Sequence, residues 1–351
     1  MQFKEERLME KTDIKNLSKA ELADHLKRLG AEPYRAPQIF KWIYGKLARS
    51  FDEMTDIPSG LRSVLKNNFH LIHLAEMDSK RSRIDGTTKY LFKLEDGNTI
   101  ETVFLPEGAR ATICLSSQVG CKYACSFCAS APFGFVRNLK TSEILDEVIR
   151  IESSHKGVPI TNIVFMGIGE PMDNYENVLK AIRILNDPAA FNIGARKITV
   201  STCGVIPGIK KLKLEKLQVE LSVSLHSSKD DVRSRLVPIN NKYPIAELMT
   251  ACKDYTESTG RVITFEYVMI KGENASVEDA KALAALLKNM KCKVNLISYN
   301  NIRAAGYVQP SASETRKFMD RLKTAGINIT RRKSKGEDID AGCCQLRISK
   351  L

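Results

Sequence analysis

The stretch Cys121-Lys-Tyr-Ala-Cys125-Ser-Phe-Cys128 places three thiols in one short segment, with three and then two residues between them. Three thiolates at this spacing fit into a single loop and can bind one soft metal centre. Zinc is the competing interpretation, but a structural zinc site usually takes four ligands from two separated pairs, and no second Cys-x-x-Cys or His-x-x-x-His follows. Three ligands leave an iron–sulfur cluster one open iron, which can bind a substrate or a cofactor.

The cysteine loop follows an apolar β-rich run, and from there such runs alternate with amphipathic segments of helix length. This alternation predicts an α/β fold with a parallel sheet covered on its outside. Six units are two fewer than the eight that close a full barrel, so we expect a partial, open (β/α)6 barrel with the cysteines at its carboxyl mouth. The expected strands are residues 111–117, 162–167, 197–202, 219–225, 262–270 and 294–299, with 328–332 as a further candidate, and the expected helices are 141–153, 175–185, 244–256, 277–289 and 312–325.

The residues before the barrel predict a small N-terminal helical domain and a linking β-hairpin. Ser18-Lys-Ala-Glu21 is a capping box, and Asp96-Gly97 between two β-rich runs supplies the positive φ angles of a tight turn. Amphipathic helices are expected over 22–29, 36–48 and 59–69, and the hairpin over 90–105. We therefore divide the chain into a helical accessory domain (1–75), a β-hairpin linker (76–110) and the barrel with a C-terminal cysteine segment (111–351).

Composition narrows the classes of function. The chain has 351 residues, with 54 Lys and Arg against 41 Asp and Glu, or +13. This excess favours a polyanionic partner such as nucleic acid, because basic side chains near phosphates release counterions, although a merely solvated basic surface has the same charge. No run reaches the roughly 20 apolar residues of a membrane-spanning helix, and residues 1–7 are too charged for a signal peptide, so we expect a cytoplasmic protein without a membrane partner. In that reducing compartment, nine cysteines indicate metal or redox chemistry.

The three-cysteine spacing resembles the hallmark of the radical S-adenosylmethionine superfamily, in which the open iron of a 4Fe–4S cluster chelates the methionine end of the cofactor. Other segments, spread over nearly the whole chain, resemble the bacterial dual-specificity adenine carbon-2 methyltransferases. They are Cys114-Leu-Ser-Ser-Gln-Val-Gly-Cys121, Met166-Gly-Ile-Gly-Glu-Pro171, Ile198-Thr-Val-Ser-Thr-Cys-Gly-Val-Ile-Pro207, Ser224-Leu-His226 and Asp338-Ile-Asp-Ala-Gly-Cys-Cys-Gln-Leu346. The resemblance implies methylation of 23S rRNA in the peptidyl-transferase region and of the adenosine 3' to the anticodon in some tRNAs.

The resemblance also implies separate roles for the cysteines. Cys121, Cys125 and Cys128 bind the cluster. Cys343 takes a methyl group from a first S-adenosylmethionine, and a second one, cleaved reductively at the cluster, yields a radical that activates this methyl, so that RNA becomes attached to Cys343. Cys114 then releases the product by forming a disulfide with Cys343, and Glu101 accepts a proton. The reaction implies an electron donor such as flavodoxin or ferredoxin, and nothing in it requires more than a monomer.

Contacts to S-adenosylmethionine follow from the same resemblance. Taken singly, each of these residues is an ordinary strand-end or core residue, and only their ordered set indicates a cofactor site. They are Gly169, Glu170, Ser201, Ser224, Leu225, His226 and Asn300. Cys203, Cys252 and Cys292 are expected to be buried small apolar residues. The helical domain and a group of basic residues near the mouth are expected to follow RNA phosphates, the latter being Arg137, Lys140, Arg303, Arg331, Arg332, Lys333 and Lys335.

Two other functions stay open from the sequence. The related carbon-8 adenine methyltransferases, which confer ribosomal antibiotic resistance, share the cysteine motif but tend to carry Ala where this chain has Pro171. A metal-stabilised RNA-binding module without catalysis is the second alternative. The chain also departs from the carbon-2 family at Cys344, which stands where Gly is usual, and this neighbour of Cys343 could compete with it for oxidation or methylation.

Overall fold

The computed structural model describes residues 11–300, 306–342 and 345. In this part of the chain, ten strands form one sheet in the order β14-β13-β12-β11-β10-β9-β6-β5-β4-β3. The strands from β6 to β14 within it run parallel, and β3, β4 and β5 run antiparallel. The parallel strands are β6 (Arg110–Cys114), β9 (Asn162–Phe165), β10 (Ile198–Thr202), β11 (Glu220–Ser224), β12 (Ile263–Met269), β13 (Cys292–Ser298) and β14 (Ile329–Arg332).

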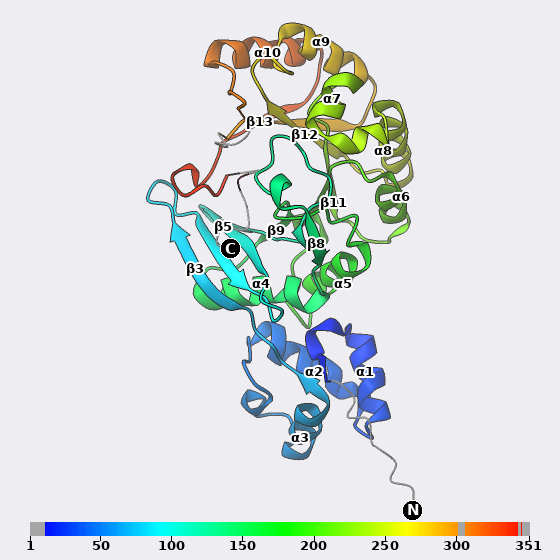
Figure 1. Cartoon of the computed structure of the whole chain (residues 1–351). Coiled ribbons are helices and arrows are strands. Elements are labelled where there is room, and N and C mark those ends of the chain that lie inside the picture. Colours follow the sequence, from blue (N-terminus) through cyan, green and yellow to red (C-terminus); the bar gives the residue numbers. More distant parts are fainter. Residues whose placement is uncertain (1–10, 301–305, 343–344, 346–351) are drawn as a thin grey trace, which may run out of the picture.

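The parallel strands agree with the predicted α/β barrel, including the candidate strand at 328–332. Their central residues are apolar and buried, as parallel strands covered on both faces require, and Ile113, Ile163 and Ile198 occupy neighbouring register positions with no exposed surface. The helices that alternate with these strands lie around the outside of the sheet (Figure 1). They are α4 (Thr141–Ser154), α5 (Tyr175–Asn186), α6 (Ile206–Leu214), α7 (Asp230–Leu236), α8 (Ile245–Thr259), α9 (Val277–Leu286) and α10 (Ala312–Thr324).

The ten-stranded sheet curls until its two edges approach each other. A flat sheet of ten strands would separate the outer strands by about 43 Å at about 4.8 Å per spacing. Yet β14 ends at Arg332, and four residues later the backbone N of Gly336 donates to Asp85 Oδ2, at 3.0 Å, in the turn between β3 and β4. Four residues span at most about 14 Å. The edges are therefore close together, which is the shape of an open barrel.

Three antiparallel strands continue the sheet beyond β6. β4 (Thr88–Lys93) and β5 (Thr99–Glu107) pair across Asp96 and Gly97, which confirms the predicted hairpin. β3 (Ala75–Arg81) was not predicted, because this edge strand is almost fully exposed and its sequence shows no apolar alternation.

The N-terminal helices form a separate group beneath α4 (Figure 1). The predicted capping box is present: Ser18 Oγ accepts from the backbone N of Glu21 at 3.2 Å, and Glu21 Oε2 accepts from the backbone N of Ser18 at 2.7 Å. The predicted helix at 36–48 is shorter, since the α-helix ends at Phe40 and gives way to one π-helical turn, Lys41–Gly45. The group comprises α1 (Lys19–Arg28), α2 (Ala36–Phe40), α3 (Ser59–Asn68) and the short paired strands β1 (Thr12–Asp13) and β2 (Phe69–His70).

A buried ion pair joins this helical group to the barrel. Lys15 Nζ lies 2.8 Å from Asp146 Oδ1 on α4, and both side chains are almost completely buried. The same carboxylate accepts from the backbone N of Leu74 and lies 3.0 Å from His73 Nδ1. Within the described ranges, none of the helices is long and apolar enough to cross a membrane.

Candidate active site

The cysteine loop lies between two short strands, β7 (Gln118–Gly120) and β8 (Phe135–Asn138). Gly120 has a φ of +73°, and a Cβ there would stand 1.9 Å from the carbonyl oxygen of Gly134. The backbone N of Cys121 donates to that same oxygen at 2.7 Å. Glycine is therefore required where the loop begins, because the two ends of the loop cross at this point.

The three cysteines of this loop line one cavity of about 150 Å³ at the carboxyl ends of the parallel strands. The cavity brings together most of the cofactor residues predicted from the sequence. Its lining includes Cys121, Cys125, Cys128, Gly169, Glu170, Ser201, Ser224 and His226. Leu225 and Asn300 are not among the lining residues; the Leu225 side chain is fully buried in the core, and Asn300 lies in the adjoining pocket described below.

The thiols stand in an environment that resists negative charge. Burial raises the pKa of Cys121 to about 12, and burial also raises the pKa of Cys125, with Cys128 and Cys121 adding to the effect. Iron bound to these sulfurs would supply the positive charge that stabilises them as thiolates. Among residues 11–300, 306–342 and 345, no group of three His, Cys, Asp or Glu is arranged to hold a single metal ion.

Two carboxylates, Glu170 and Glu266, line this cavity, and Glu170 is 3% exposed. Burial raises its pKa, but backbone donors hold it in place: Cys203 N donates to Oε2 at 2.7 Å and Met172 N to Oε1 at 3.0 Å. A carboxylate that is buried, hydrogen-bonded and close to the three thiols suits the ammonium group of a methionine moiety, because that cation would replace the solvation that burial removes.

The glycines before Glu170 allow two segments of the chain to approach closely. A Cβ on Gly167 would stand 2.6 Å from the carbonyl oxygen of Leu115. A Cβ on Gly169 would stand 2.6 Å from Cβ of Gln118. The close approach is thus to the segment that leads from β6 into the cysteine loop, and it aligns the two loops that carry Cys121 and Glu170.

His226 follows β11 in a left-handed conformation with a φ of +57°. Its Nδ1 accepts from the backbone N of Val268 at 3.0 Å, and its ring meets Phe127 of the cysteine loop edge to face. Burial, with the charge of Arg233 adding, lowers the pKa of His226 to about 3. The imidazole is therefore neutral with its proton on Nε2, which makes it a hydrogen-bond donor at the cavity.

A second, smaller pocket of about 40 Å³ adjoins the cavity and contains Cys114 at the end of β6. The two share Met166, Ile297 and Arg332 as lining residues, and Arg332 Nη1 lies 3.7 Å from Met166 Sδ. Its other walls come from β5, the end of β13 and the C-terminal segment, and include Val103, Leu105, Asn300, Ala341 and Gly342.

Glu101 is buried on β5, two residues before Val103 and on the same strand face. One of its carboxylate oxygens lies 3.5 Å from Lys89 Nζ, and that amine also donates to the carbonyl oxygen of Asp340 at 3.1 Å. Glu101 is therefore next to the C-terminal segment, although it lines neither the cavity nor the pocket.

The C-terminal segment, residues 333–342, crosses from β14 to the β3–β4 turn and closes the Cys114 pocket. Asp338 accepts from the backbone N of Arg83 at 3.1 Å, and Ser334 Oγ donates to Asn300 Oδ1 at 2.7 Å. The segment brings Gly342 to the pocket wall. Cys343, the predicted methyl carrier, and Cys344 lie outside the described residues.

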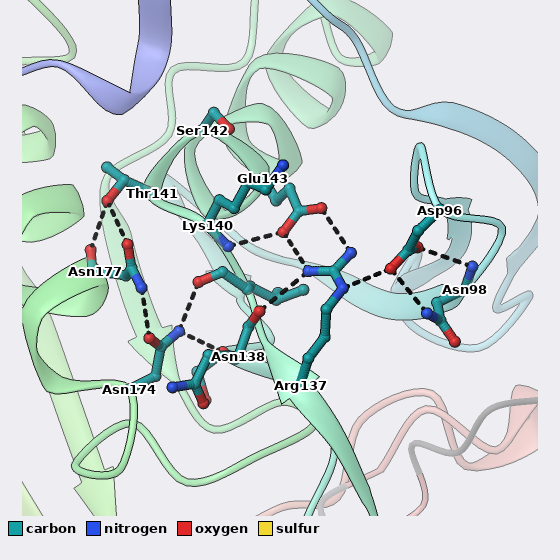
Figure 2. A network of polar contacts seen from close by, with 12 residues as sticks. Asp96, Asn98, Arg137, Asn138, Lys140, Thr141, Ser142, Glu143, Asn174 and Asn177 are labelled. Atoms are coloured by element: carbon teal, nitrogen blue, oxygen red, sulfur yellow. Dashed lines mark hydrogen bonds and ion pairs between the residues drawn. The ribbon is translucent and has the colours of Figure 1, made fainter. Parts of the chain in front are cut away.

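Arg137, which was expected to follow RNA phosphates, lies in an intramolecular network of ion pairs. Figure 2 shows its guanidinium between two carboxylates: Nη1 and Nη2 each donate to Glu143 at 2.8 Å, and Nε donates to Asp96 at 2.5 Å. These ion pairs tie β8, behind the cysteine loop, to the start of α4 and to the β4–β5 turn. Lys335 is also paired, at 3.6 Å from Glu107, and Arg303 lies outside the described residues.

Three residues of the site were missed or misjudged from the sequence. Gln118 is buried and bridges the two loops, since its Nε2 donates to Asn138 Oδ1 and its Oε1 accepts from the backbone N of Glu170, both at 2.8 Å. Cys203 is buried as expected but also lines the cavity, and Arg233 is a fully buried cation behind it. A charged residue in a short helix carries no sequence signal of burial.

Comparison with known proteins agrees with this geometry. Residues 115–287 match the radical SAM superfamily, and residues 12–71 match the ribosomal RNA large subunit methyltransferase N-terminal domain. A crystal structure of a radical SAM methyltransferase from Sphaerobacter thermophilus superimposes with a TM-score of 0.92 at 44% identity, covering 96% of this chain and all of that one. The fold and the three-cysteine cavity thus define a radical SAM enzyme.

Full-length relatives narrow the class. Probable dual-specificity RNA methyltransferases RlmN from Lachnospira eligens and Thermotoga maritima are each 46% identical, over 96% and 97% of this chain and 96% and 98% of their own lengths. A third, from Clostridioides difficile, is 44% identical over 97% of this chain. The chain belongs to the RlmN family of dual-specificity RNA methyltransferases. Membership implies a 4Fe–4S cluster and S-adenosylmethionine, and the three thiols, with Glu170 beside them in one cavity, fit both groups.

Proposed function

We propose that this chain methylates carbon-2 of an adenosine in the peptidyl-transferase region of 23S rRNA and of the adenosine 3' to the anticodon in some tRNAs. The observation that carries the proposal is the pair of adjoining pockets. One is lined by three cysteine thiols, and the other by Cys114 and the segment that leads into Cys343. Methyl transfer through a protein cysteine needs this adjacency, because the methyl carrier must reach both the cofactor and the resolving thiol.

In this proposal Cys121, Cys125 and Cys128 hold the cluster, which supplies the electron that cleaves S-adenosylmethionine. Glu170 binds the ammonium group of the methionine moiety, His226 donates a hydrogen bond from Nε2, and Ser201 and Ser224 complete the lining of the cofactor cavity. Leu225 and Asn300 act from beside the cavity: the backbone of Leu225 accepts from Arg233, and Asn300 faces the Cys114 pocket.

Cys343 carries the methyl carbon that becomes bonded to RNA. Formation of this bond releases one proton from carbon-2, which Glu101 accepts, and one electron, which passes to a one-electron acceptor. Cys114 then attacks the sulfur of Cys343: a sulfur–sulfur bond forms, the bond between Cys343 and the methylene carbon breaks, and that carbon keeps the electron pair and takes up a proton. The resulting disulfide must be reduced before the next turnover. Burial of Cys114 favours this route, since the docked C-terminal segment helps to exclude water from the thiol.

The partners of the reaction follow from its chemistry. The match of residues 12–71 to a ribosomal RNA methyltransferase N-terminal domain supports an RNA-contacting role for the helical region. We keep the domain divisions after residues 75 and 110 as part of the proposal. Cleavage of S-adenosylmethionine requires a one-electron donor, for which a flavodoxin or ferredoxin is suited. Ribosomal and transfer RNA place the enzyme in the cytoplasm, and we propose that it acts there as a monomer.

The test is an anaerobic reaction of the reconstituted chain with methyl-deuterated S-adenosylmethionine, a reductant and unmodified 23S rRNA or tRNA, followed by mass spectrometry of the digested nucleosides. Deuterated 2-methyladenosine is the expected product. 8-Methyladenosine would overturn the carbon-2 assignment in favour of the antibiotic-resistance relatives. No methylated adenosine from a chain with an intact cluster would overturn the RNA substrate.

A further inference from the structure

Arg233 on α7 has no exposed surface, although it carries a permanent positive charge. Its guanidinium makes four hydrogen bonds, all to neutral acceptors. Nε donates to the carbonyl oxygen of Leu225 at 3.1 Å and Nη1 to Asn240 Oδ1 at 2.8 Å, while Nη2 donates to the carbonyl oxygens of Cys203 at 2.8 Å and Ser224 at 3.2 Å. The polar atoms are satisfied, but the charge is not neutralised.

Among the residues that the structure describes, no carboxylate forms an ion pair with this guanidinium. In the described part of the chain, the ion pairs of α7 belong to Arg235, on the outer face of the helix, and not to Arg233. Asp230 is near enough for its charge to act on Arg233, but its Oδ1 accepts from Asn240 Nδ2 at 2.8 Å and makes no direct hydrogen bond with the guanidinium. A buried charge without a counter-charge is strongly unfavourable, so a negative group is expected on the side of Arg233 that faces the cavity.

The cysteine cavity is on that side. Two of the four acceptors, the carbonyls of Cys203 and Ser224, belong to residues that line it. A 4Fe–4S cluster on three thiolates carries a net negative charge, which increases by one when the cluster is reduced.

The same helix also fixes the cysteine loop. The backbone N of Ser126, which lies between Cys125 and Cys128, donates to the carbonyl oxygen of Leu236 at the end of α7, at 3.0 Å. One short helix therefore fastens the ends of β10 and β11 through Arg233 and the cysteine loop through Leu236. Any change in this helix acts on the three thiols and on the cofactor residues together.

We propose that Arg233 is the buried counter-charge of the iron–sulfur cluster, a positioning residue that ties the cofactor strands to the cysteine loop and raises the reduction potential of the cluster. When the cluster accepts one electron from an external reductant, the nearby positive charge stabilises the more negative product, and no bond forms or breaks. The inference rests on the proposed function, because it requires the cluster to bind at Cys121, Cys125 and Cys128.

The test compares three variants of the reconstituted full-length chain. Arg233→Gln removes the charge and keeps an amide, and Arg233→Lys keeps the charge but loses the forked hydrogen bonds. Arg235→Gln is the matched control, because it removes the same charge from the same helix at a side chain that is 57% exposed and pairs with Glu273 at 3.1 Å. The measurement is the midpoint potential from an anaerobic dithionite titration followed by electron paramagnetic resonance, after iron and sulfide content have been matched.

At a fixed ambient potential, we expect Arg233→Gln to lower the ratio of reduced to oxidised cluster about tenfold, a midpoint shift of about 59 mV to more negative values for a one-electron couple. Arg233→Lys and Arg235→Gln should stay close to the wild type. A wild-type potential in a fully loaded Arg233→Gln chain would overturn the inference.

If Arg233→Gln holds no cluster, the midpoint potential of the cluster in Arg233→Lys tests the inference instead. A wild-type potential in this variant supports Arg233 as the counter-charge, and a tenfold loss of reduced cluster contradicts it. Failure of the wild type itself to bind a cluster would instead overturn the proposed function. The two failures are therefore distinguishable without any measurement of RNA methylation.

Discussion

The cysteine cavity and the Cys114 pocket adjoin each other but are built in different ways. The cavity lies at the ends of successive parallel strands, and hydrogen bonds such as those of the buried Gln118 side chain hold its loops together. The pocket takes one wall from β5 and β6 and the other from Ala341 and Gly342, which are brought back by contacts at the β3–β4 turn. The cofactor cavity is thus a property of the sheet, whereas the methyl-transfer pocket depends on the docking of one segment.

Among the variants that test the two sites, Cys125→Ala should have the largest effect, because it disables the cysteine cavity. Loss of one of three cluster ligands should abolish the 400-nm absorbance of the reconstituted protein and all methylation, while the fold persists because the loop stays anchored through Ser126 and Gly120. Absorbance, iron content and circular dichroism measure this. Cys292→Ala, at a half-buried cysteine on β13, is the control and should keep its cluster. A stable cluster in Cys125→Ala would remove Cys125 from the ligand set.

Cys114→Ala changes the methyl-transfer pocket and leaves the cysteine cavity intact. The cluster should remain, because Cys114 lies in the second pocket, but product release should fall about 100-fold as RNA stays attached to Cys343. Denaturing gel electrophoresis with labelled RNA detects the adduct, and nucleoside mass spectrometry measures the product. Cys252→Ala, which removes a buried thiol on α8, should form no adduct. Normal turnover by Cys114→Ala would contradict its resolving role.

Two aspartates at opposite ends of β4 allow the pocket and the cavity to be disturbed separately. Asp85 accepts from the backbone N of Gly336, so Asp85→Ala should loosen the C-terminal segment and lower methylation about 10-fold with full cluster content. Asp96 pairs with Arg137 behind the cysteine loop, so Asp96→Ala should instead reduce cluster content under limiting iron. Hydrogen exchange at residues 336–342 and iron analysis separate the effects. If both variants change hydrogen exchange and iron content to the same extent, the cysteine cavity and the Cys114 pocket are not independently built.

The smallest expected effect is a pH dependence of the cavity. Burial lowers the pKa of His226 to about 3, whereas an unfolded histidine titrates near 6.5. Below about pH 6.5 the unfolded state therefore takes up a proton that the folded state does not, and stability falls as pH decreases. Between pH 7.5 and 5.5, wild-type apoprotein should lose about 1 kcal/mol more unfolding free energy than His226→Gln in urea titrations. His25→Gln, on α1, should keep the wild-type dependence.

Sequence patterns predicted the parts of the fold that repeat. Apolar β-branched runs marked the parallel strands, since these strands are buried on both faces, and the capping box at Ser18 and the turn at Gly97 carried their own local signals. The three cysteines were expected at the carboxyl mouth of the barrel because they follow a predicted strand, and Glu170 was assigned to the same site by resemblance. The structure places them in a single cavity.

The rest depends on contacts between distant segments, which leave no local pattern. Arg137 looks like any surface cation until Asp96 and Glu143 are seen on either side of it. Arg233 lies in a seven-residue helix too short for a periodic signal, and its burial follows from the carbonyls of two strand ends. Leu225 and Asn300 were assigned to the cofactor by resemblance, and the structure places them beside the cavity rather than in its lining.

The bond between Asp85 and Gly336 spans 251 residues of sequence, and this separation has a consequence for synthesis. A bacterial ribosome adds about 5–20 residues per second, so roughly 10–50 s pass between the emergence of one partner and the other. The barrel strands and the cysteine loop can fold during that time, and folding brings the end of β14 within four residues of the bond to Asp85, so that only the short C-terminal segment remains to be ordered. A nascent chain can therefore form its iron–sulfur site before it can form the pocket that uses it, and the thiol of Cys114 waits in an unfinished enzyme until the last segment arrives.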